Sequence, residues 1–228
     1  MKQHLKRLAA PRTWPVARKT SKFIARPLPG AHRLGMCMPL GVILRDVLGR
    51  ASSAREARLI VRNRNVLVDN RPVTESRFQV GLMDTLSLPE TGEYYRMAVN
   101  SRGQLALVPI PAEEASLKVC SVVRKTVVGG GSIQASLHDG RVVSSGSAYS
   151  IGDGLLIRLP GQEIVSHLKL EKGAIVYMAG GRHIGRMGVV EDFSGTKLVI
   201  NVGGESVQTL KRFAIVVGRD HPIVRVVQ

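Results

Sequence analysis

"SSAREARLIVRNRNVLVDNRPV" spans residues 52–73 and decides how the middle of this chain is expected to fold. Ser53 is followed three residues later by Glu56, and this capping-box spacing predicts that a helix starts there. The apolar side of the predicted helix comprises Ala57, Ile60 and Val61. Because these positions lie on one side of a helix, the opposite side is expected to face the surface.

Arginines occupy that opposite side. Arg55, Arg58 and Arg62 recur at spacings of three and four residues, which brings them onto one helix face. A helix face that is merely solvated usually mixes Glu with Lys, whereas only Glu56 relieves the repulsion here. Neighbouring like charges cost stability unless a polyanion neutralises them, so the pattern favours a phosphate partner over a solvated face.

Short elements are predicted on either side of this helix. Upstream, "PLGVILRDVLG" predicts a helix that starts at Pro39 and stops at Gly49. Downstream, Asn63 or Asn65 is expected to give the second helix a left-handed end. "VLVDNRPV" then predicts two strands joined by a tight Asp69-Asn70 turn, and "VGLMDTLSLPE" predicts a further strand.

Two short helices followed by a small sheet resemble a known RNA-binding module. Residues 41–91 are similar to the alpha-L module shared by ribosomal proteins, pseudouridine synthases and tyrosyl-tRNA synthetases. The resemblance implies that the second helix and the following turn contact the RNA backbone. One departure is Asn65, where that family often has Gly; Asn also tolerates the left-handed region.

The first 40 residues have no hydrophobic period and are interpreted as a basic, extended arm with little core of its own. Residues 1–45 carry ten Lys or Arg and no Asp or Glu. Such a segment suits a targeting peptide, a membrane-surface anchor, a passive solubilising tail or an arm that binds a polyanion. Prolines disfavour the first two, because both need an uninterrupted amphipathic helix: Pro11, Pro15, Pro27 and Pro29.

Charge is divided unevenly along the chain, whose net charge is +16. Residues 90–171 carry eight basic and eight acidic side chains, whereas residues 172–228 carry eight against four. Two basic zones therefore flank a neutral middle, which is typical of a nucleic-acid footprint rather than of a uniform solubilising charge. Arg outnumbers Lys 23 to 10, which suits bidentate phosphate recognition.

The second half of the chain is predicted to be β-rich. Residues 92–171 alternate apolar and polar positions between glycine-marked turns, and the run "VVGGGSIQA" is interpreted as a hairpin loop, not a P-loop. Residues 172–228 contain "KGAIVYMAGGRHIGRMGVVEDF", which resembles the KOW motif of ribosomal proteins and elongation factors. Its structural glycines would be Gly181, Gly185 and Gly188, and the following strands would close a small barrel.

Nothing in the sequence forms a recognisable catalytic or metal-binding motif. Cys37 and Cys120 are isolated and are interpreted as reduced, buried residues, and His138 and His167 have no partner at ligand spacing. A weak internal echo spaces Asp69 from Asp84 and Asp139 from Asp153 by 15 and 14 residues. No cofactor, metal or small-molecule substrate is therefore expected, and no apolar run is long enough to span a membrane.

The opening stretch "HLKRLAAPRTWPVAR" narrows the alternatives. It resembles the signature of ribosomal protein family S4e, and "RPLPGAHRLGMCMPL" continues the resemblance. Arm, alpha-L module, β-rich middle and KOW-like unit also follow in that family's order. The matching residues are His4, Lys6, Arg7, Leu8, Ala9, Pro11, Trp14, Val16 and Arg18. The Gly/Lys residues that usually precede this His are absent, and the length near 228 residues resembles archaeal members.

The resemblance implies an α+β, mostly β protein of the small ribosomal subunit, acting in the cytoplasmic ribosome and performing no chemistry. The expected parts are an arm (1–40), an alpha-L module (41–91), a β-rich domain (92–171) and a KOW-like barrel (172–228). Ribosomal RNA and neighbouring ribosomal proteins are the expected partners. An accessory of an RNA-modifying enzyme and a transcription elongation or RNA-chaperone protein remain alternatives.

Side chains expected to contact RNA come from the arm, the second helix, its following turn and the KOW-like loop. They are His4, Lys6, Arg7, Arg12, Trp14, Arg18, Lys19, Lys22, Arg26, Arg33, Arg55, Arg58, Arg62, Arg64, Arg71, Arg182, His183 and Arg186. Trp14 and His4 could stack on exposed bases, and packing of Trp14 against the folded body is an equal alternative.

Overall fold

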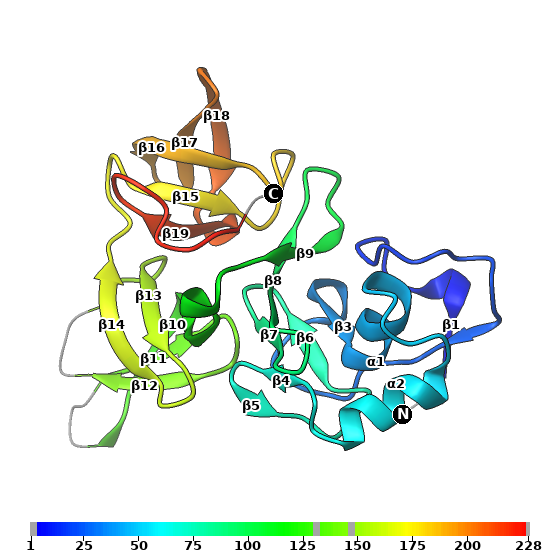
Figure 1. Ribbon diagram of the computed structural model, residues 1–228. Helices are drawn as coiled ribbons and strands as arrows, with labels where there is room; N and C mark the ends of the chain where they lie inside the picture. Colours follow the sequence, from blue (N-terminus) through cyan, green and yellow to red (C-terminus); the bar gives the residue numbers. More distant parts are fainter. Residues whose placement is uncertain (1–3, 130–132, 146–148, 227–228) are drawn as a thin grey trace.

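Three five-stranded antiparallel sheets carry most of the chain in the computed structural model, which describes residues 4–129, 133–145 and 149–226 (Figure 1). The arm and both helices lie with the first sheet at one side of the molecule, and the other two sheets form separate lobes (Figure 1). No helix within these ranges has the length and apolar content needed to cross a bilayer.

The first predicted helix is present as a short, irregular one. Helix α1 (Leu40–Val42) starts directly after Pro39 and continues as a wider helical turn over Ile43–Val47. The chain leaves the helix at Gly49, whose φ of +64° is accessible to glycine without strain. The predicted start and stop are both confirmed.

Helix α2 (Ala54–Arg62) begins with the predicted cap. The Ser53 hydroxyl accepts a hydrogen bond from the Glu56 N–H at 3.2 Å. The reciprocal bond differs from the expected one, since the Glu56 carboxylate accepts from the N–H of Ser52 at 2.7 Å instead of from Ser53. The hydroxyl of Ser52, at 2.8 Å, and its N–H both donate to this carboxylate and lower the pKa of Glu56, so the ionised carboxylate favours the helix start.

The end of α2 corrects the prediction. Asn63 has a φ of −73° and its N–H still donates to the Leu59 carbonyl, so the helical hydrogen bonding extends one residue further. The left-handed residue is Arg64, with a φ of 59°, and neither Asn63 nor Asn65 adopts that conformation. The left-handed conformation at the helix end is therefore adopted by Arg64, whose Cβ makes that conformation sterically unfavourable.

The strands after α2 form the predicted hairpin. Strands β4 (Leu67–Val68) and β5 (Arg71–Pro72) pair antiparallel, and Asp69 and Asn70 between them both have positive φ, as a type I′ turn requires. The sheet order is β5-β4-β7-β8-β9, with β7 (Thr85–Leu88), β8 (Glu93–Val99) and β9 (Leu105–Pro109). A smaller pair joins β3 (Cys37–Pro39) to β6 (Gln79–Gly81). The expected boundary at residue 91 thus falls inside one continuous sheet.

The central sheet has the order β12-β11-β10-β13-β14. Its members are β10 (Leu117–Val127), β11 (Ile133–Leu137), β12 (Val142–Ser145), β13 (Gly154–Arg158) and β14 (Glu163–Leu168). The long strand β10 pairs with β13 along its first part and with β11 from Val122 onward, with a bulge between Val122 and Arg124. The expected hairpin at the glycine run joins β10 to β11, and residues 130–132 of that loop lie outside the described residues.

The C-terminal sheet has the order β18-β17-β16-β15-β19. Its members are β15 (Ile175–Met178), β16 (Met187–Ser194), β17 (Lys197–Val202), β18 (Glu205–Leu210) and β19 (Ala214–Gly218). In the described chain β18 and β19 are its two edges, so the strands form an open half-barrel and not the closed barrel expected. Among the following strands expected to close the barrel, IVRVV is not a strand over its described residues 223–226: Ile223 donates one bond to Val217, and Val224 and Val226 are buried without joining a sheet.

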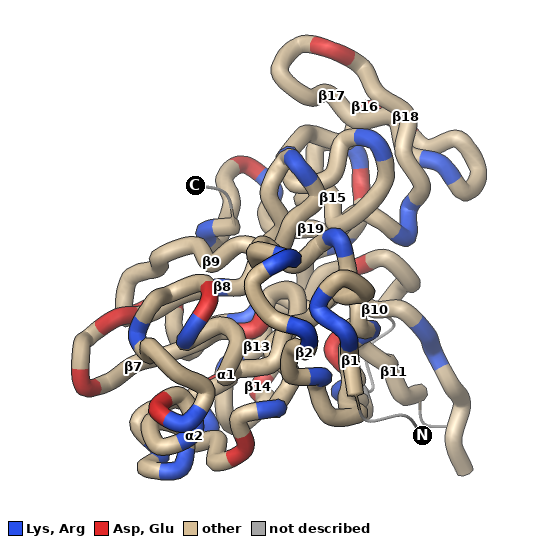
Figure 2. The backbone as a smooth tube through the Cα atoms, turned by 90° about the vertical axis from the view of Figure 1, so that its right-hand side faces the viewer, with Lys and Arg blue, Asp and Glu red and all other residues tan. Residues whose placement is uncertain are grey.

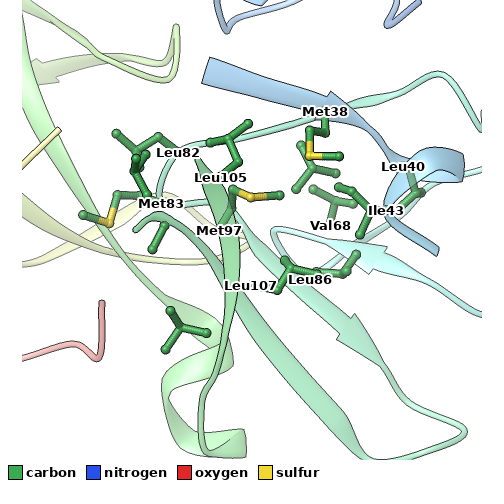
Figure 3. Packing of buried hydrophobic residues seen from close by; sticks show 14 of the residues in the cluster. Met38, Leu40, Ile43, Val68, Leu82, Met83, Leu86, Met97, Leu105 and Leu107 are labelled. Atoms are coloured by element: carbon green, nitrogen blue, oxygen red, sulfur yellow. The ribbon is translucent and has the colours of Figure 1, made fainter. Parts of the chain in front are cut away.

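One hydrophobic core joins the arm, the helices and the first sheet. Met38 and Leu40 pack with the strand residues Leu86 and Met97, and Figure 3 shows this packing. The other two sheets each have an apolar cluster of their own and also contribute to the first core, through Val119 of β10 and Val217 of β19. The Tyr177 hydroxyl connects the C-terminal lobe to β8 by donating to the Val99 carbonyl at 2.6 Å.

The arm contributes to that core, in line with the packing alternative for Trp14. Trp14 is 1% exposed, and Ala10 and Ile24 are buried with it. The Leu105 N–H of β9 donates to the Thr13 carbonyl at 2.7 Å, and β1 (Leu5–Lys6) pairs with β2 (Phe23–Ile24). Burial of a side chain as large as Trp contributes on the order of 2–3 kcal/mol to stability. The arm therefore has no core of its own and is anchored in the core of the helices and the first sheet.

Candidate nucleic-acid interface

The outer face of α2 carries the predicted row of arginines. Arg55, Arg58 and Arg62 are exposed, as is Arg64 just beyond the helix, while Ala57 and Val61 are buried on the opposite side. None of these four arginines has an ion-pair partner within the described part of the chain. Four guanidinium groups without carboxylates leave their hydrogen-bond donors available to an external anion.

Most cations of the arm are also at the surface. Arg18 is half-buried and donates to the carbonyls of Leu8, Ala10 and Pro11 at 2.9–3.1 Å, so it holds the arm's own turn. Lys and Arg positions recur along the arm and α2 on the side that Figure 2 turns to the viewer. The exposed members of the predicted set are His4, Lys6, Arg12, Lys19, Lys22 and Arg33, and Arg26 is half-buried.

Two arm residues in the predicted set are not at the surface. Trp14 is buried in the core, so the prediction that it stacks on a base is wrong and the packing alternative is what the structure shows. Arg7 is 3% exposed; its guanidinium donates to Asp46 at 3.3 Å and to the Ala17 carbonyl. The Arg7 guanidinium therefore binds groups of the protein itself and not RNA, because a buried charge needs such partners.

A groove separates the arm from the helices. It encloses about 210 Å³, and its walls come from the β1–β2 pair, from α1, from the start of α2 and from residues 76–77. Four arginines line it: Arg26, Arg45, Arg58 and Arg77. The groove thus continues the basic face of α2 toward the arm.

Phe23 at this groove was missed by the sequence interpretation. It is 49% exposed on β2, its ring centroid lies 5.8 Å from that of His4, and the Lys22 ammonium lies 5.6 Å from the centroid. The signal in the sequence was a single aromatic residue among cations, "SKFIAR", which is too short to distinguish from an anchoring residue.

The remaining predicted positions lie apart from the α2 face. Arg71 in the β4–β5 hairpin is exposed and donates to the Pro160 carbonyl at 3.3 Å. Arg182 and Arg186 are exposed and His183 is half-buried, in the loop before β16. The lobe of β15–β19 lies apart from α2 in Figure 1, and this loop packs on the β8–β9 turn, so it forms a basic site separate from the α2 face.

The glycines of that loop have steric roles. Gly185 has a φ of +78°, and a Cβ there would lie 2.4 Å from the carbonyl carbon of Asn100 in the β8–β9 turn. Gly188 would place a Cβ 2.5 Å from the Asn201 carbonyl oxygen on β17. Gly181 adopts a φ of +85° at the surface. Two of the three positions therefore allow close backbone packing, which a side chain would prevent.

A different set of charges is buried between the first and central sheets. The Lys118 ammonium on β10 is 1% exposed and lies 2.7 Å from Asp69, 2.5 Å from Asp84 and 3.0 Å from Asp139. Arg141 adds contacts of 2.6 Å to Asp69 and 3.2 Å to Asp139. We call these five side chains the Lys118 cluster.

Titration in the Lys118 cluster follows from its composition of three carboxylates and two cations. Despite desolvation, Lys118 and His32 lower the pKa of Asp84, whereas burial and the charge of Asp84 raise the pKa of Asp69. The carboxylates in turn raise the pKa of Lys118, which stays charged. The two cations of the cluster are thus paired with carboxylates of the protein, and these ion pairs connect the first sheet to the central sheet.

The internal echo of aspartates in the sequence has a structural counterpart at its second positions, Asp84 and Asp153. Asp84 accepts from the Gly81 N–H at 2.7 Å, and Asp153 accepts from the Ser150 N–H at 2.8 Å, so each carboxylate closes a four-residue turn before a strand. Each also contacts a histidine, at 3.2 Å to His32 and 2.6 Å to His167. His167 thus contacts a carboxylate of the protein itself.

Within the described ranges, no group of three or more His, Cys, Asp and Glu side chains could hold a metal ion. Cys37 and Cys120 are free and buried, and burial raises the pKa of Cys37 to about 11. Such thiols are poor nucleophiles at neutral pH. The exposed arginines of the α2 face are suited to binding an anion.

Three family descriptions match consecutive parts of the chain. The RS4NT domain matches residues 1–35, the S4 domain matches residues 38–86, and the ribosomal family S4e matches residues 91–164. The S4 match covers both helices, the β4–β5 hairpin and the arginine face of α2.

Similar proteins match along nearly the whole length. A small ribosomal subunit protein eS4 from Methanocaldococcus jannaschii is 41% identical over 98% of this chain and 97% of its own. One from Methanothermobacter thermautotrophicus is 39% identical over 98% and 95%. The crystal structure of the 30S ribosomal protein S4e from Thermoplasma acidophilum superposes with a TM-score of 0.71 at 30% identity, covering 80% of this chain and 95% of that one.

Proposed function

This chain belongs to the S4e family of ribosomal proteins, and from that premise we propose that it binds ribosomal RNA through the arm and the outer face of α2. Proteins of this family are structural components of the small ribosomal subunit and not enzymes, and the S4 domain is an RNA-binding module. The alternatives of an RNA-modifying accessory and an elongation or RNA-chaperone protein are therefore not retained.

The row Arg55, Arg58 and Arg62 is the observation that carries this proposal. These side chains are exposed, lie on one helix face and have no internal ion pair among the described residues. An arginine can bind a phosphate through two parallel hydrogen bonds, so a row with helical spacing suits consecutive phosphates of a backbone. The exposed arm cations extend this footprint on the same side (Figure 2).

The other two lobes have different expected roles. The central sheet lies in the charge-neutral part of the chain, so it would face solvent or neighbouring ribosomal proteins and contribute few RNA contacts. The loop with Arg182 and Arg186, which packs on the β8–β9 turn, would act as a KOW-like unit that contacts RNA apart from the α2 face.

The test is incorporation into small subunits and its dependence on salt. Full-length tagged protein is expected to co-sediment with small subunits at high salt. The triple variant Arg55→Glu, Arg58→Glu, Arg62→Glu should bind rRNA roughly 100-fold more weakly and lower the slope of log affinity against log salt by about 2 to 3.

A matched control is a triple Arg→Glu variant with the same change of charge at positions outside the proposed interface. Arg102, Arg124 and Arg158 are exposed but lie outside the arm and α2. Their replacement by Glu should leave the salt slope nearly unchanged. Equal losses in both triple variants would mean that net charge and not the α2 face determines binding, which would overturn the proposed interface.

A further inference from the structure

The groove between the arm and the helices combines an aromatic surface with arginines. Phe23 and His4 line it from the arm, and Arg58 lines it from the first turns of α2. A volume of about 210 Å³ has room for a single base and not for a helix of paired RNA. Its walls are thus chemically suited to one nucleotide.

Phe23 has a position that packing alone does not explain. Its neighbour Ile24 is buried in the core, whereas Phe23 leaves 49% of its surface accessible. The His4 ring lies 5.8 Å away at an interplanar angle of 50°, so the two rings form an angled aromatic wall. Exposed aromatic rings beside cations are the usual platform on which proteins stack unpaired bases.

The arginines of the groove differ in how far they are engaged. Arg45 is paired with Asp46 at 2.6 Å, and Arg77 lies 3.7 Å from Glu75. Arg58 has no ion pair among the described residues and comes from the RNA-facing row of α2. A phosphate that lies on this row is therefore adjacent to the groove, with Arg58 shared between the two.

The arm must be docked for the groove to exist, and the buried residues Arg7 and Trp14 dock it. Arg7 reaches Asp46 beside α1 at 3.3 Å, and Trp14 anchors the following turn in the core. Arg7 is thus a positioning residue that fixes the β1–β2 pair opposite the helices. The site is built before RNA arrives.

We propose that this groove holds one unpaired nucleotide of the bound RNA, with its base against Phe23 and His4 and its phosphate at Arg58. The inference rests on the proposed function, since the RNA that lies on α2 supplies the nucleotide. It adds a distinction between RNA forms, because a base in a duplex is not available to enter the groove.

The test compares two RNA probes with the full-length protein. One is a fluorescein-labelled single-stranded U10 oligonucleotide, and the other is a blunt 16-base-pair RNA duplex. Phe23→Ala is expected to weaken binding of U10 by roughly 5- to 100-fold and to leave binding of the duplex unchanged. Its salt slope should also stay unchanged, because a stacking ring carries no charge.

Companion variants separate stacking from packing. Phe23→Trp should retain affinity for U10, whereas Phe23→Leu, which keeps an apolar side chain without a ring face, should lose it. Leu8→Ala is the matched control, since Leu8 is 68% exposed on the same arm but does not line the groove. Ultraviolet cross-linking of a 4-thiouridine oligonucleotide should attach within residues 4–26.

The outcomes are distinguishable from failure of the proposed function. If Phe23→Ala binds U10 as the wild type does, or if Phe23→Leu retains full affinity, the nucleotide site is wrong while rRNA binding by α2 stands. If the wild type binds neither probe and does not enter small subunits, the proposed function fails and the site fails with it.

Discussion

The outer face of α2 and the Lys118 cluster are both groups of basic side chains, yet they are used in opposite ways. On α2, Arg55, Arg58 and Arg62 are exposed without ion pairs among the described residues. In the cluster, Lys118 is 1% exposed and contacts three carboxylates within 3.0 Å. The position of the carboxylates decides whether a cation holds the fold together or remains available to an external anion.

This difference has an energetic reason. An exposed guanidinium keeps its water and costs little, whereas a buried ammonium loses its hydration and must recover several kcal/mol from its partners. Unpaired cations are therefore tolerated only at the surface. A chain of net charge +16 that pairs its buried cations internally leaves its excess charge for the outside.

Removal of Lys118 is expected to have the largest effect. Lys118→Met leaves three neighbouring carboxylates without their common cation, and breaking a buried pair typically costs about 3–5 kcal/mol of unfolding free energy. The change is measured by chemical denaturation. Lys125→Met on the same strand β10, outside the cluster, should change stability by less than about 0.5 kcal/mol. A loss below about 1 kcal/mol for Lys118→Met would show that the cluster does not join the lobes.

The next effect is a dependence of stability on pH. Burial and then Lys118 lower the pKa of His138 from 6.5 to about 4, against the opposing effect of Asp139. The unfolded chain thus binds this proton below about pH 6.5 and the folded chain only below about pH 4, so stability is lost as the pH falls through this window.

The His138 effect has a defined size and control. At about 1.4 kcal/mol for each pKa unit, the loss between pH 6.5 and pH 4 amounts to roughly 3 kcal/mol. His138→Gln retains a donor toward the Leu82 carbonyl, to which His138 Nε2 lies at 3.3 Å, and does not titrate. The wild type should therefore lose stability relative to His138→Gln on acidification. Parallel pH profiles would rule out this role.

A smaller effect is expected at the start of the arginine helix. Ser53→Ala removes the hydroxyl that accepts from the Glu56 N–H and should cost about 1 kcal/mol in thermal or chemical denaturation. Ser53→Asp supplies an equivalent acceptor at the helix N-terminus and should retain stability. Loss of stability in both variants would assign the effect to another feature of the turn.

The smallest change tests whether Arg64 is kept for binding. With a φ of 59° this residue is strained, so Arg64→Gly should stabilise the free protein by about 0.5–1 kcal/mol while weakening rRNA binding severalfold. Arg62→Gly, inside α2, should instead destabilise by about 1 kcal/mol. If Arg64→Gly leaves rRNA affinity intact, Arg64 lies outside the interface.

The local patterns around α2 were predictable from the sequence, and the partners of individual side chains were not. The Ser53 cap, the Asp69-Asn70 turn and the arginine row followed from spacings of two to four residues. The helix end at Arg64 was not predictable in this way. An Asn is the usual left-handed residue, but the N–H of Asn63 still donates to the Leu59 carbonyl, so the left-handed conformation falls on Arg64.

Contacts between residues far apart in the chain could not be predicted from the spacing of residues in the sequence. The sequence left Trp14 between stacking on RNA and packing on the body and placed Arg7 among the RNA contacts, and the fold buries both against distant segments. Likewise the repeated aspartates were visible as an echo, while the cation that gathers three of them, Lys118, comes from a strand between the two copies.

The sequence by itself determined the modules, their order, the basic face of α2 and the RNA-binding family, because these depend on residue types and on short spacings along the chain. Only the tertiary structure decided which cations are available. It buried Arg7 and Lys118 beside carboxylates, left the α2 row without ion pairs among the described residues, and brought Phe23 and Arg58 to one groove. Desolvation and pairing are properties of position in space, and position in space is set by contacts between residues far apart in the chain.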